Sequence, residues 1–432
     1  MQPGGSISGA HATVRQGVLR EPALLALSLV VATVAVLFWR RPDQFFAPMI
    51  WAEDSTILGD YAAHGWASIV VPIQGYHILS TKLITMSSFQ LSFALAPYFA
   101  LWITVAFTCL VVLAVALSPT HLRLKPLCAL AVLLVPTDGE VFAVSEYSFW
   151  WAGILLLLAL LWDHGLPWLR AGYIVLGGLS SPLIGPAAVL LAGRAALERT
   201  GLSIGIAALA TALAAVQTIT AYFNIVNFGE VALELHTLKV ASERFVGFFY
   251  VGSGLLPEYR YSRVGYVILA TLAVMAFLRR DRLDRHFMLL VLVWAAICAM
   301  MIVRAPIGKI HPFLSGPRYF FYPFILMTWA GLWIAAVSGP VVKWVLGIAY
   351  MAALWFAVAY EYLPGYRFAG FTRRHDHVDW SEHVRRCTQR GDTEKYVMPI
   401  HHNGDGSALW PRDLAGAQCR ALVAGSLFGR AP

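Results

Sequence analysis

PALLALSLVVATVAVLFWRRPDQFFAPMIWAEDS, residues 22–55, joins an apolar run to a doubly acidic turn. The run from Pro22 to Trp39 carries no charge and is long enough for a helix to cross the hydrocarbon core of a bilayer. Glu53 and Asp54 follow shortly after this crossing. A carboxylate near a membrane is costly unless it is solvated, paired or used, so this turn is the first candidate site of the chain.

Composition extends this interpretation to most of the sequence. Of 432 residues, 59% are hydrophobic and 13% are charged, whereas about a quarter of the residues of a soluble globular chain are charged. We therefore expect a polytopic membrane protein with three parts: a cytoplasmic N-terminus at 1–21, a transmembrane domain at 22–360 and a more polar tail at 361–432. The apolar run lacks a small-residue cleavage signature, which predicts a retained helix rather than a removed signal peptide.

Apolar runs predict an all-α bundle of about 11 transmembrane helices. They lie at about 22–39, 91–117, 127–135, 152–162, 172–192, 202–223, 264–278, 287–303, 319–337 and 341–360. The run at 172–192 contains Ser180-Ser181-Pro182, so it can form one kinked span or a hairpin of two short helices. We prefer the hairpin, which brings the count to 11 and puts the two chain ends on opposite faces.

Charge supports that topology. With the hairpin counted as two spans, the turns on the N-terminal side carry a net charge of +7 and the opposite loops carry −1. Because basic residues gather on the cytoplasmic side, the N-terminus is expected there, and the acidic turn and the tail are expected outside. A single kinked span would put the basic turn at 279–285 outside, which the same rule disfavours. In a soluble chain the net charge of +8 would suggest nucleic acid as a partner. Here most of the basic residues border apolar runs, so the topology of a membrane protein accounts for them.

We make three further predictions for the segments outside the spans. Residues 43–90 mix apolar and polar positions at helical spacing, which predicts short interfacial helices. Arg40 and Arg41 end the first span and can reach lipid headgroups. Cys387 and Cys419 in the tail can form a disulfide if the compartment is oxidising, or can remain free thiols.

Carboxylates and cations together suggest transfer chemistry at the membrane surface. Transfer of a sugar from a lipid phosphate needs a base for the acceptor and cations for the departing phosphate. Glu53 and Asp54 are the candidate catalytic acids. The candidate phosphate-binding residues are Arg304, Lys309, His311 and Arg318. Each group also has a plainer interpretation, as solvated acids or as headgroup anchors.

Aromatic and polar residues of the outer loops are candidates for substrate binding. They are Tyr76, His77, Lys82, Glu146, Trp150 and Tyr319. Aromatic rings beside polar groups stack on sugar faces, but Trp and Tyr also form the interfacial belt of membrane proteins.

No metal site is predicted, although a divalent cation remains compatible with the acidic loop. The tail contains His375, Asp376, His377, Asp379 and His383. Their spacing matches no standard ligand pattern, and a solvated loop is the simpler interpretation. A phosphate-binding glycine loop of the nucleotide type is also lacking, so the sequence does not support ATP or nucleotide-sugar chemistry.

Five short motifs resemble those of bacterial polytopic proteins similar to the GT-C glycosyltransferases. They are Trp51-Ala52-Glu53-Asp54, Gly75-Tyr76-His77, Gly139-Glu140-Val141-Phe142, Gly178-Leu179-Ser180-Ser181-Pro182 and Gly316-Pro317-Arg318-Tyr319-Phe320. The resemblance covers most of the membrane domain and implies a catalytic acid in the first outer loop, here Asp54 or Glu53. It also implies polyprenyl-phosphate sugar donors and juxtamembrane helices in that loop. The adjacent acids depart from the common Asp-x-Asp form, which leaves open which of them acts.

The leading hypothesis is a glycosyltransferase of the bacterial cytoplasmic membrane that acts on its outer face. The donor would be a polyprenyl-phosphate sugar, and the acceptor a glycan, lipid or protein. The alternative is a transporter or flippase for a lipid-linked or small anionic solute, because broken helices are also typical of transporters. The sequence lacks the mid-membrane charges and inverted repeats that a transporter would favour. A third hypothesis is a catalytically silent scaffold of a glycan-assembly complex.

Overall fold

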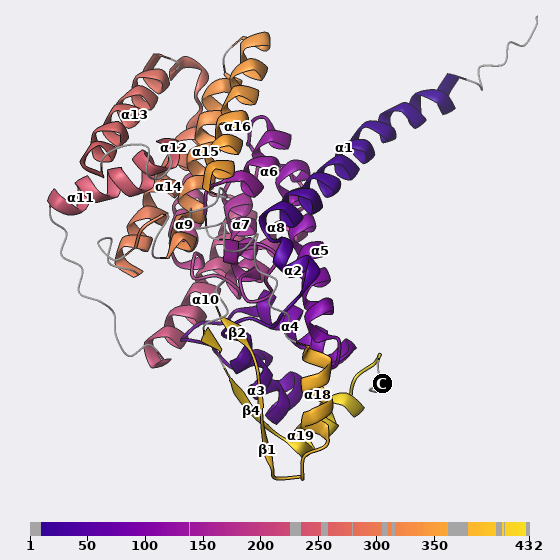
Figure 1. Cartoon of the computed structure of the whole chain (residues 1–432). Helices are drawn as coiled ribbons and strands as arrows, with labels where there is room; N and C mark the ends of the chain where they lie inside the picture. Colours follow the sequence, from indigo (N-terminus) through magenta and orange to yellow (C-terminus); the bar gives the residue numbers. More distant parts are fainter. Residues whose placement is uncertain are drawn as a thin grey trace, which may run out of the picture.

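The chain forms a bundle of helices with a small mixed α/β tail (Figure 1). This computed structural model describes residues 10–137, 139–224, 235–251, 258–278, 280–304, 310–312, 316–337, 339–361, 379–402, 408–409 and 411–428.

The N-terminal half of the described chain supplies ten helices, some from the apolar runs and others from the first loop. They are α1 (Ala10–Arg40), α2 (Pro42–Phe46), α3 (Asp54–His64), α4 (Leu79–Leu91), α5 (Ala96–Leu117), α6 (Lys125–Leu134), α7 (Ser148–Leu160), α8 (Pro167–Gly178), α9 (Ile184–Glu198) and α10 (Gly201–Asn224). Short 3₁₀ turns lie at Gly65–Val70 and Gly139–Val141. The first loop is therefore helical, as its spacing predicts.

The C-terminal half of the bundle continues in the same way. Its helices are α11 (Leu235–Ser242), α12 (Phe248–Val251), α13 (Glu258–Leu278), α14 (Arg285–Arg304), α15 (Phe321–Ala336) and α16 (Pro340–Glu361). A π-helical turn at Glu243–Gly247 joins α11 to α12, and 3₁₀ turns lie at Arg280–Arg282 and Pro317–Phe320.

Six helical segments are long and apolar enough to cross a bilayer. Among the described residues these are Pro22–Arg40, Ala96–Leu117, Gly201–Asn224, Arg260–Leu278, Arg285–Val303 and Pro317–Ala336. Two shorter apolar helices, Lys125–Leu134 and Ser148–Leu160, lie among them and are largely buried. The protein is therefore a helical membrane protein with several candidate spans. The number of about 11 spans stays a prediction.

The run at 172–192 forms a hairpin. Helices α8 and α9 are separated by a break at Leu179–Leu183. Ser181 N still donates to Gly177 O of α8 at 2.8 Å, but Pro182 has no N–H and ends this series of backbone hydrogen bonds. Pro167 and Glu198, at the outer ends of the two helices, line the same cavity, whereas Pro182 at the break lines a different one. The chain therefore reverses direction at the break, as the hairpin interpretation predicts.

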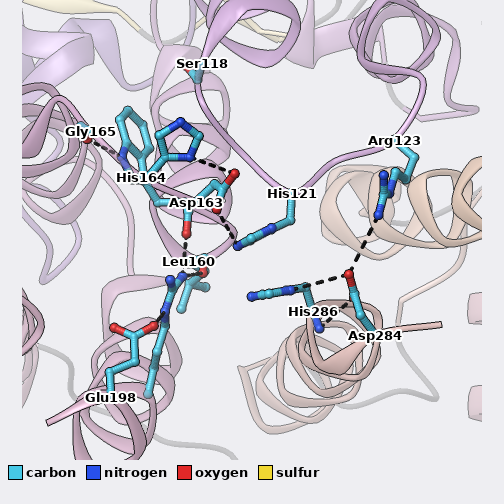
Figure 2. A network of polar contacts seen from close by, with 12 residues as sticks. Ser118, His121, Arg123, Leu160, Asp163, His164, Gly165, Glu198, Asp284 and His286 are labelled. Carbon is cyan, nitrogen blue, oxygen red and sulfur yellow. Dashed lines mark hydrogen bonds and ion pairs between the residues drawn. The ribbon is translucent and has the colours of Figure 1, made fainter. Parts of the chain in front are cut away.

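Four turns that the topology assigns to one face meet in a polar network (Figure 2). The rings of His121 and His286 stack with their centroids 3.3 Å apart, and His121 lies 3.4 Å from a carboxylate oxygen of Asp163. Arg194, near the end of α9, donates to the carbonyls of Leu160 and Trp162 at 2.9 and 2.7 Å. These contacts show that the turns share one end of the bundle, opposite the break between α8 and α9.

Arg40 and Arg41 do not reach lipid headgroups, so that expectation is wrong. Both side chains are fully buried. Arg40 donates to the carbonyls of Leu133, Val135 and Thr137 at 2.9 to 3.0 Å, in the last turn of α6 and just beyond it. The carbonyls at a helix C-terminus lack intrahelical partners, and the guanidinium satisfies them. The end of the first helix thus holds the loop that leads to Glu146.

Arg41 completes this anchor. Its guanidinium pairs with Asp43 through two hydrogen bonds of 2.8 and 2.9 Å. It also donates to the carbonyls of Gly139 and Phe142 at 2.9 and 3.2 Å. A buried arginine is tolerated because its charge is paired and its donors are used.

The tail is a small α/β unit closed by a disulfide. Strands β1 (Lys395–Met398) and β4 (Arg412–Ala415) pair antiparallel, as do β2 (His401–His402) and β3 (Ala408–Leu409). Helices α18 (Trp380–Thr388) and α19 (Gly416–Ala424) are joined by a disulfide between Cys387 and Cys419. Of the two alternatives for this cysteine pair, the structure shows the bridge.

The tail packs on the helices of the first loop. Trp380 Nε1 donates to Phe93 O at 2.7 Å, and Gln90 Nε2 donates to Gly425 O at 2.6 Å. The Arg412 guanidinium covers Gly59 of α3 so closely that a Cβ there would overlap it. In Figure 1 the yellow tail accordingly lies against α3 and α4.

Candidate functional site

A cavity of about 590 Å³ opens where the first loop, the second acidic loop and the α8–α9 break meet. This volume is within the range usual for small-molecule sites. Six of the predicted site residues line it: Glu53, Tyr76, Glu146, Trp150, Arg318 and Tyr319. They come from four separate segments, and the fold brings them together.

Two carboxylates face this cavity. The Glu53 backbone N–H donates to Glu146 Oε2 at 3.0 Å, and the Glu53 carboxylate accepts from Gln74 Nε2 at 2.6 Å. Glu146 is 2% exposed, and its Oε1 has no hydrogen-bond partner among the described residues. A buried acceptor without a partner costs free energy, so Glu146 is poised to accept a hydrogen bond from a bound molecule.

Asp54 lies beneath the cavity rather than on its wall. Its side chain is fully buried, and its two oxygens accept from Thr85 Oγ1 at 2.8 Å and Ser145 Oγ at 2.7 Å. Burial raises the pKa of the Asp54 carboxyl from 3.8 to about 6, against the lowering effect of these two hydrogen bonds. Since Ser145 precedes Glu146, Asp54 fixes the segment that carries Glu146.

Arg318 brings a cation to the opposite wall. It forms a salt bridge of 3.0 Å with Glu140 and lies 5.6 Å from the centre of the Tyr147 ring. About a third of the Arg318 side chain is exposed. Gly316, with a φ of +68°, starts the turn that presents Arg318, a conformation that favours glycine.

Aromatic rings and methionines form the rest of the wall. Trp150 stacks obliquely on Tyr322 with ring centroids 5.0 Å apart, and Trp150 Nε1 is buried without an acceptor among the described residues. Beyond them the lining becomes apolar, with Met300 and Met301 of α14 and Ala214 of α10. The cavity therefore has a polar end and an apolar end.

Two predicted substrate-binding residues lie outside the cavity. Lys82 is 1% exposed and donates to the carbonyls of Ser68 and Val71, and burial lowers its pKa to about 8. His77 Nε2 lies 3.2 Å from Thr220 Oγ1. Both residues hold the first loop in shape.

Of the four predicted phosphate-binding residues, only Arg318 is seen to line the cavity. Lys309 and the side chain of Arg304 lie outside the described residues. The His311 ring packs edge-on against Phe248 at 4.6 Å and does not line the cavity.

The tail histidine cluster does not assemble into a metal site in the described part of the chain. No group of three or more histidine, cysteine, aspartate or glutamate ligands occurs there. Asp379 caps α18 by accepting from Glu382 N, and His383 hydrogen-bonds Tyr396 at 2.8 Å. His375, Asp376 and His377 are outside the described residues.

Sequence reasoning missed Gln217. This residue lies in the apolar helix α10, yet it binds the first loop through His77 N and His77 O and the end of α8 through Gly178 O, with three hydrogen bonds of 3.0 Å. A polar amide in the middle of a predicted span is a signal that could have identified it, because such a group needs partners inside the protein.

No protein-family model, curated protein or solved structure matches this chain.

Proposed function

We propose that the protein is an integral membrane glycosyltransferase that uses a polyprenyl-phosphate sugar as donor. The observation that carries the proposal is the amphipathic cavity, which combines two carboxylates, one arginine and an apolar end. A sugar joined to a lipid through a phosphate has the same order of polar, anionic and apolar parts.

Two unpartnered atoms support a polar ligand at the carboxylate end. Glu146 Oε1 can accept a hydrogen bond and Trp150 Nε1 can donate one, and neither has a partner among the described residues. A sugar hydroxyl does both. Buried polar groups are normally satisfied in folded proteins, so this pair favours a hydroxyl-bearing occupant.

In this proposal Glu146 is the general base. It takes the proton of the acceptor hydroxyl, whose oxygen attacks the anomeric carbon while the bond from that carbon to the phosphate oxygen breaks. Arg318 stabilises the departing lipid phosphate, because its planar guanidinium can bind two phosphate oxygens. Glu53 holds Glu146 through its backbone N–H and can share the role, whereas Asp54 acts as a positioning residue.

The test is a transfer assay in proteoliposomes with a panel of radiolabelled polyprenyl-phosphate sugars. We expect Glu146→Gln to lower the rate about 100-fold or more, which is the usual contribution of a general base. Asp60→Asn is the matched control, because Asp60 belongs to α3 in the same loop but does not line the cavity. Transfer at the wild-type rate by Glu146→Gln would contradict the assigned base.

The transporter alternative is an outcome of the same experiment. The α8–α9 break lines the cavity, and broken helices also form transport sites. If label crosses the bilayer without entering any acceptor, the protein is a transporter. If wild type neither transfers nor moves label from any donor, the proposal fails.

A further inference from the structure

A second cavity of about 590 Å³ lies at the opposite end of the bundle. It is formed by the turn after α7, the start of α8, the end of α9 and the start of α10. Its charged lining residues are Asp163, His164, Arg170, Arg194, Glu198 and Arg285. Since α10 has its first turn at this cavity and its last turns at the candidate site, the two cavities occupy opposite ends of the helices.

Arg170 is the central group of this cavity. It is 5% exposed, so the residue is more than nine-tenths buried, and its only hydrogen bond to the described residues runs from Nε to Ala159 O at 3.1 Å. No carboxylate pairs with it there. A guanidinium has five N–H donors, and a buried cation without a counter-ion is costly. Arg170 therefore has unused donors and charge at the cavity wall.

The neighbouring carboxylates form no ion pair with Arg170 and are bound by other side chains. Glu198 is bound by Arg194 at 2.6 Å, and Asp163 is bound by His164 at 2.8 Å. Arg285 is exposed at the rim and forms no hydrogen bond or ion pair with the described residues. With each acid already paired, the cavity keeps an excess of positive charge on Arg170 and Arg285.

The start of α10 adds partial positive charge to the cavity. Thr200 Oγ1 accepts from Ser203 N at 3.1 Å, a cap that places the first turn of the helix at the cavity. A helix N-terminus carries partial positive charge and exposes backbone N–H groups. The hydroxyls of Thr200 and Ser203 line the same wall.

We propose that this cavity binds a phosphate group. The forked donors of a guanidinium match the oxygens of a phosphate better than those of a spherical anion, and a helix N-terminus favours the same ligand. The phosphate can belong to a lipid headgroup of the leaflet at this end of the bundle or to a soluble phosphate. The site is separate from the proposed transferase site and does not depend on it.

Binding measurements on the purified, delipidated protein in detergent test the proposal. One arm uses equilibrium dialysis with radiolabelled inorganic phosphate. The other uses native mass spectrometry with a short-chain phosphatidylglycerol and, for comparison, the diacylglycerol of the same chains. We expect one phosphate-bearing molecule per protein chain, and an affinity about tenfold lower in Arg170→Gln, as expected for the loss of one charged hydrogen-bond donor.

Two further variants keep the test independent of folding. Arg285→Gln alters an exposed side chain without described contacts and should also weaken binding. Arg123→Gln is the control: Arg123 lies at the same end of the bundle, 3.8 Å from Asp284, but does not line the cavity. Its affinity should equal that of wild type.

The two arms identify the source of the phosphate. Binding of inorganic phosphate indicates a soluble ligand, whereas binding of phosphatidylglycerol alone indicates a headgroup. The proposal is overturned if neither probe binds, if diacylglycerol binds as well as phosphatidylglycerol, or if Arg170→Gln and Arg285→Gln bind like wild type.

Discussion

At the scale of single residues, neighbouring acids have different environments. Glu53 and Asp54 are adjacent in the chain, but Glu53 lines the cavity and Asp54 is fully buried between two hydroxyls. Successive residues at the start of a helix point in different directions. One of the two acids is therefore available to a ligand, and the other secures the wall.

Asp54 should make the stability of the protein depend on pH. Burial raises its pKa from 3.8 to about 6, so the carboxyl stabilises the folded state fully below pH 3.8 and loses this contribution as pH rises through about 6. The loss should amount to roughly 3 kcal/mol at neutral pH. Asp54→Asn should remove this part of the pH dependence. Thermal unfolding between pH 4 and 8 measures it, and Asp60→Asn should behave like wild type.

Substitution of Arg40 should lower the free energy of unfolding more than most substitutions in the first helix. Arg40→Met would leave the carbonyls of Leu133, Val135 and Thr137 without their donor, at a cost of about 2–4 kcal/mol. Thermal unfolding at a constant pH checks this. Arg123→Gln, at a side chain that is 54% exposed, should cost less than about 1 kcal/mol. Equal effects of the two variants would contradict the anchoring role of Arg40.

At the scale of elements, helices position loops that are distant in sequence. Gln217 of α10 holds the turn at His77 and the end of α8 through one amide. Ser180 Oγ accepts from Ser80 N at 2.9 Å and so ties the start of α4 to the α8–α9 break. The first loop is thus supported by the hairpin and by α10, and these elements enclose the cavity.

Gln217→Leu should loosen this support. The change keeps most of the volume but removes three hydrogen bonds of 3.0 Å, which should lower the free energy of unfolding by about 2–4 kcal/mol. If the cavity binds the proposed donor, binding of the donor should weaken as well, because Gln74 and Tyr76 beside this turn line the cavity. Thr211→Val, at an exposed position of the same helix, should have little effect on either measurement.

At the scale of the whole molecule, the two ends of the bundle differ in character. One end holds the amphipathic cavity and the tail, and the other holds the stacked histidines and the cavity around Arg170. Positive charge is concentrated in the turns of the second end. The positive-inside rule therefore predicts that the tail and the amphipathic cavity are extracytoplasmic.

Cysteine labelling tests this orientation. In intact cells, Lys395→Cys in the tail should react with a membrane-impermeant maleimide, whereas Arg123→Cys should react only after permeabilisation. Both side chains are more than half exposed, and the three free cysteines, Cys109, Cys128 and Cys298, are buried. The reverse labelling pattern would contradict this orientation and indicate a cytoplasmic tail.

The sequence by itself determined the membrane class, the positions of most helices and which turns share a face. These properties depend on the length, polarity and charge of continuous segments, so they can be read locally. The α8–α9 hairpin followed in the same way from Ser180-Ser181-Pro182.

Only the tertiary structure decided which side chains face the cavity. Arg40 resembles a headgroup anchor in sequence, but carbonyls more than 90 positions away make it a buried support. In sequence, Glu146 looks like an ordinary acidic residue of a loop. In the structure its Oε1 is buried and has no partner among the described residues. The environment of a charge is set by segments that the fold brings next to it, and local sequence does not contain those segments.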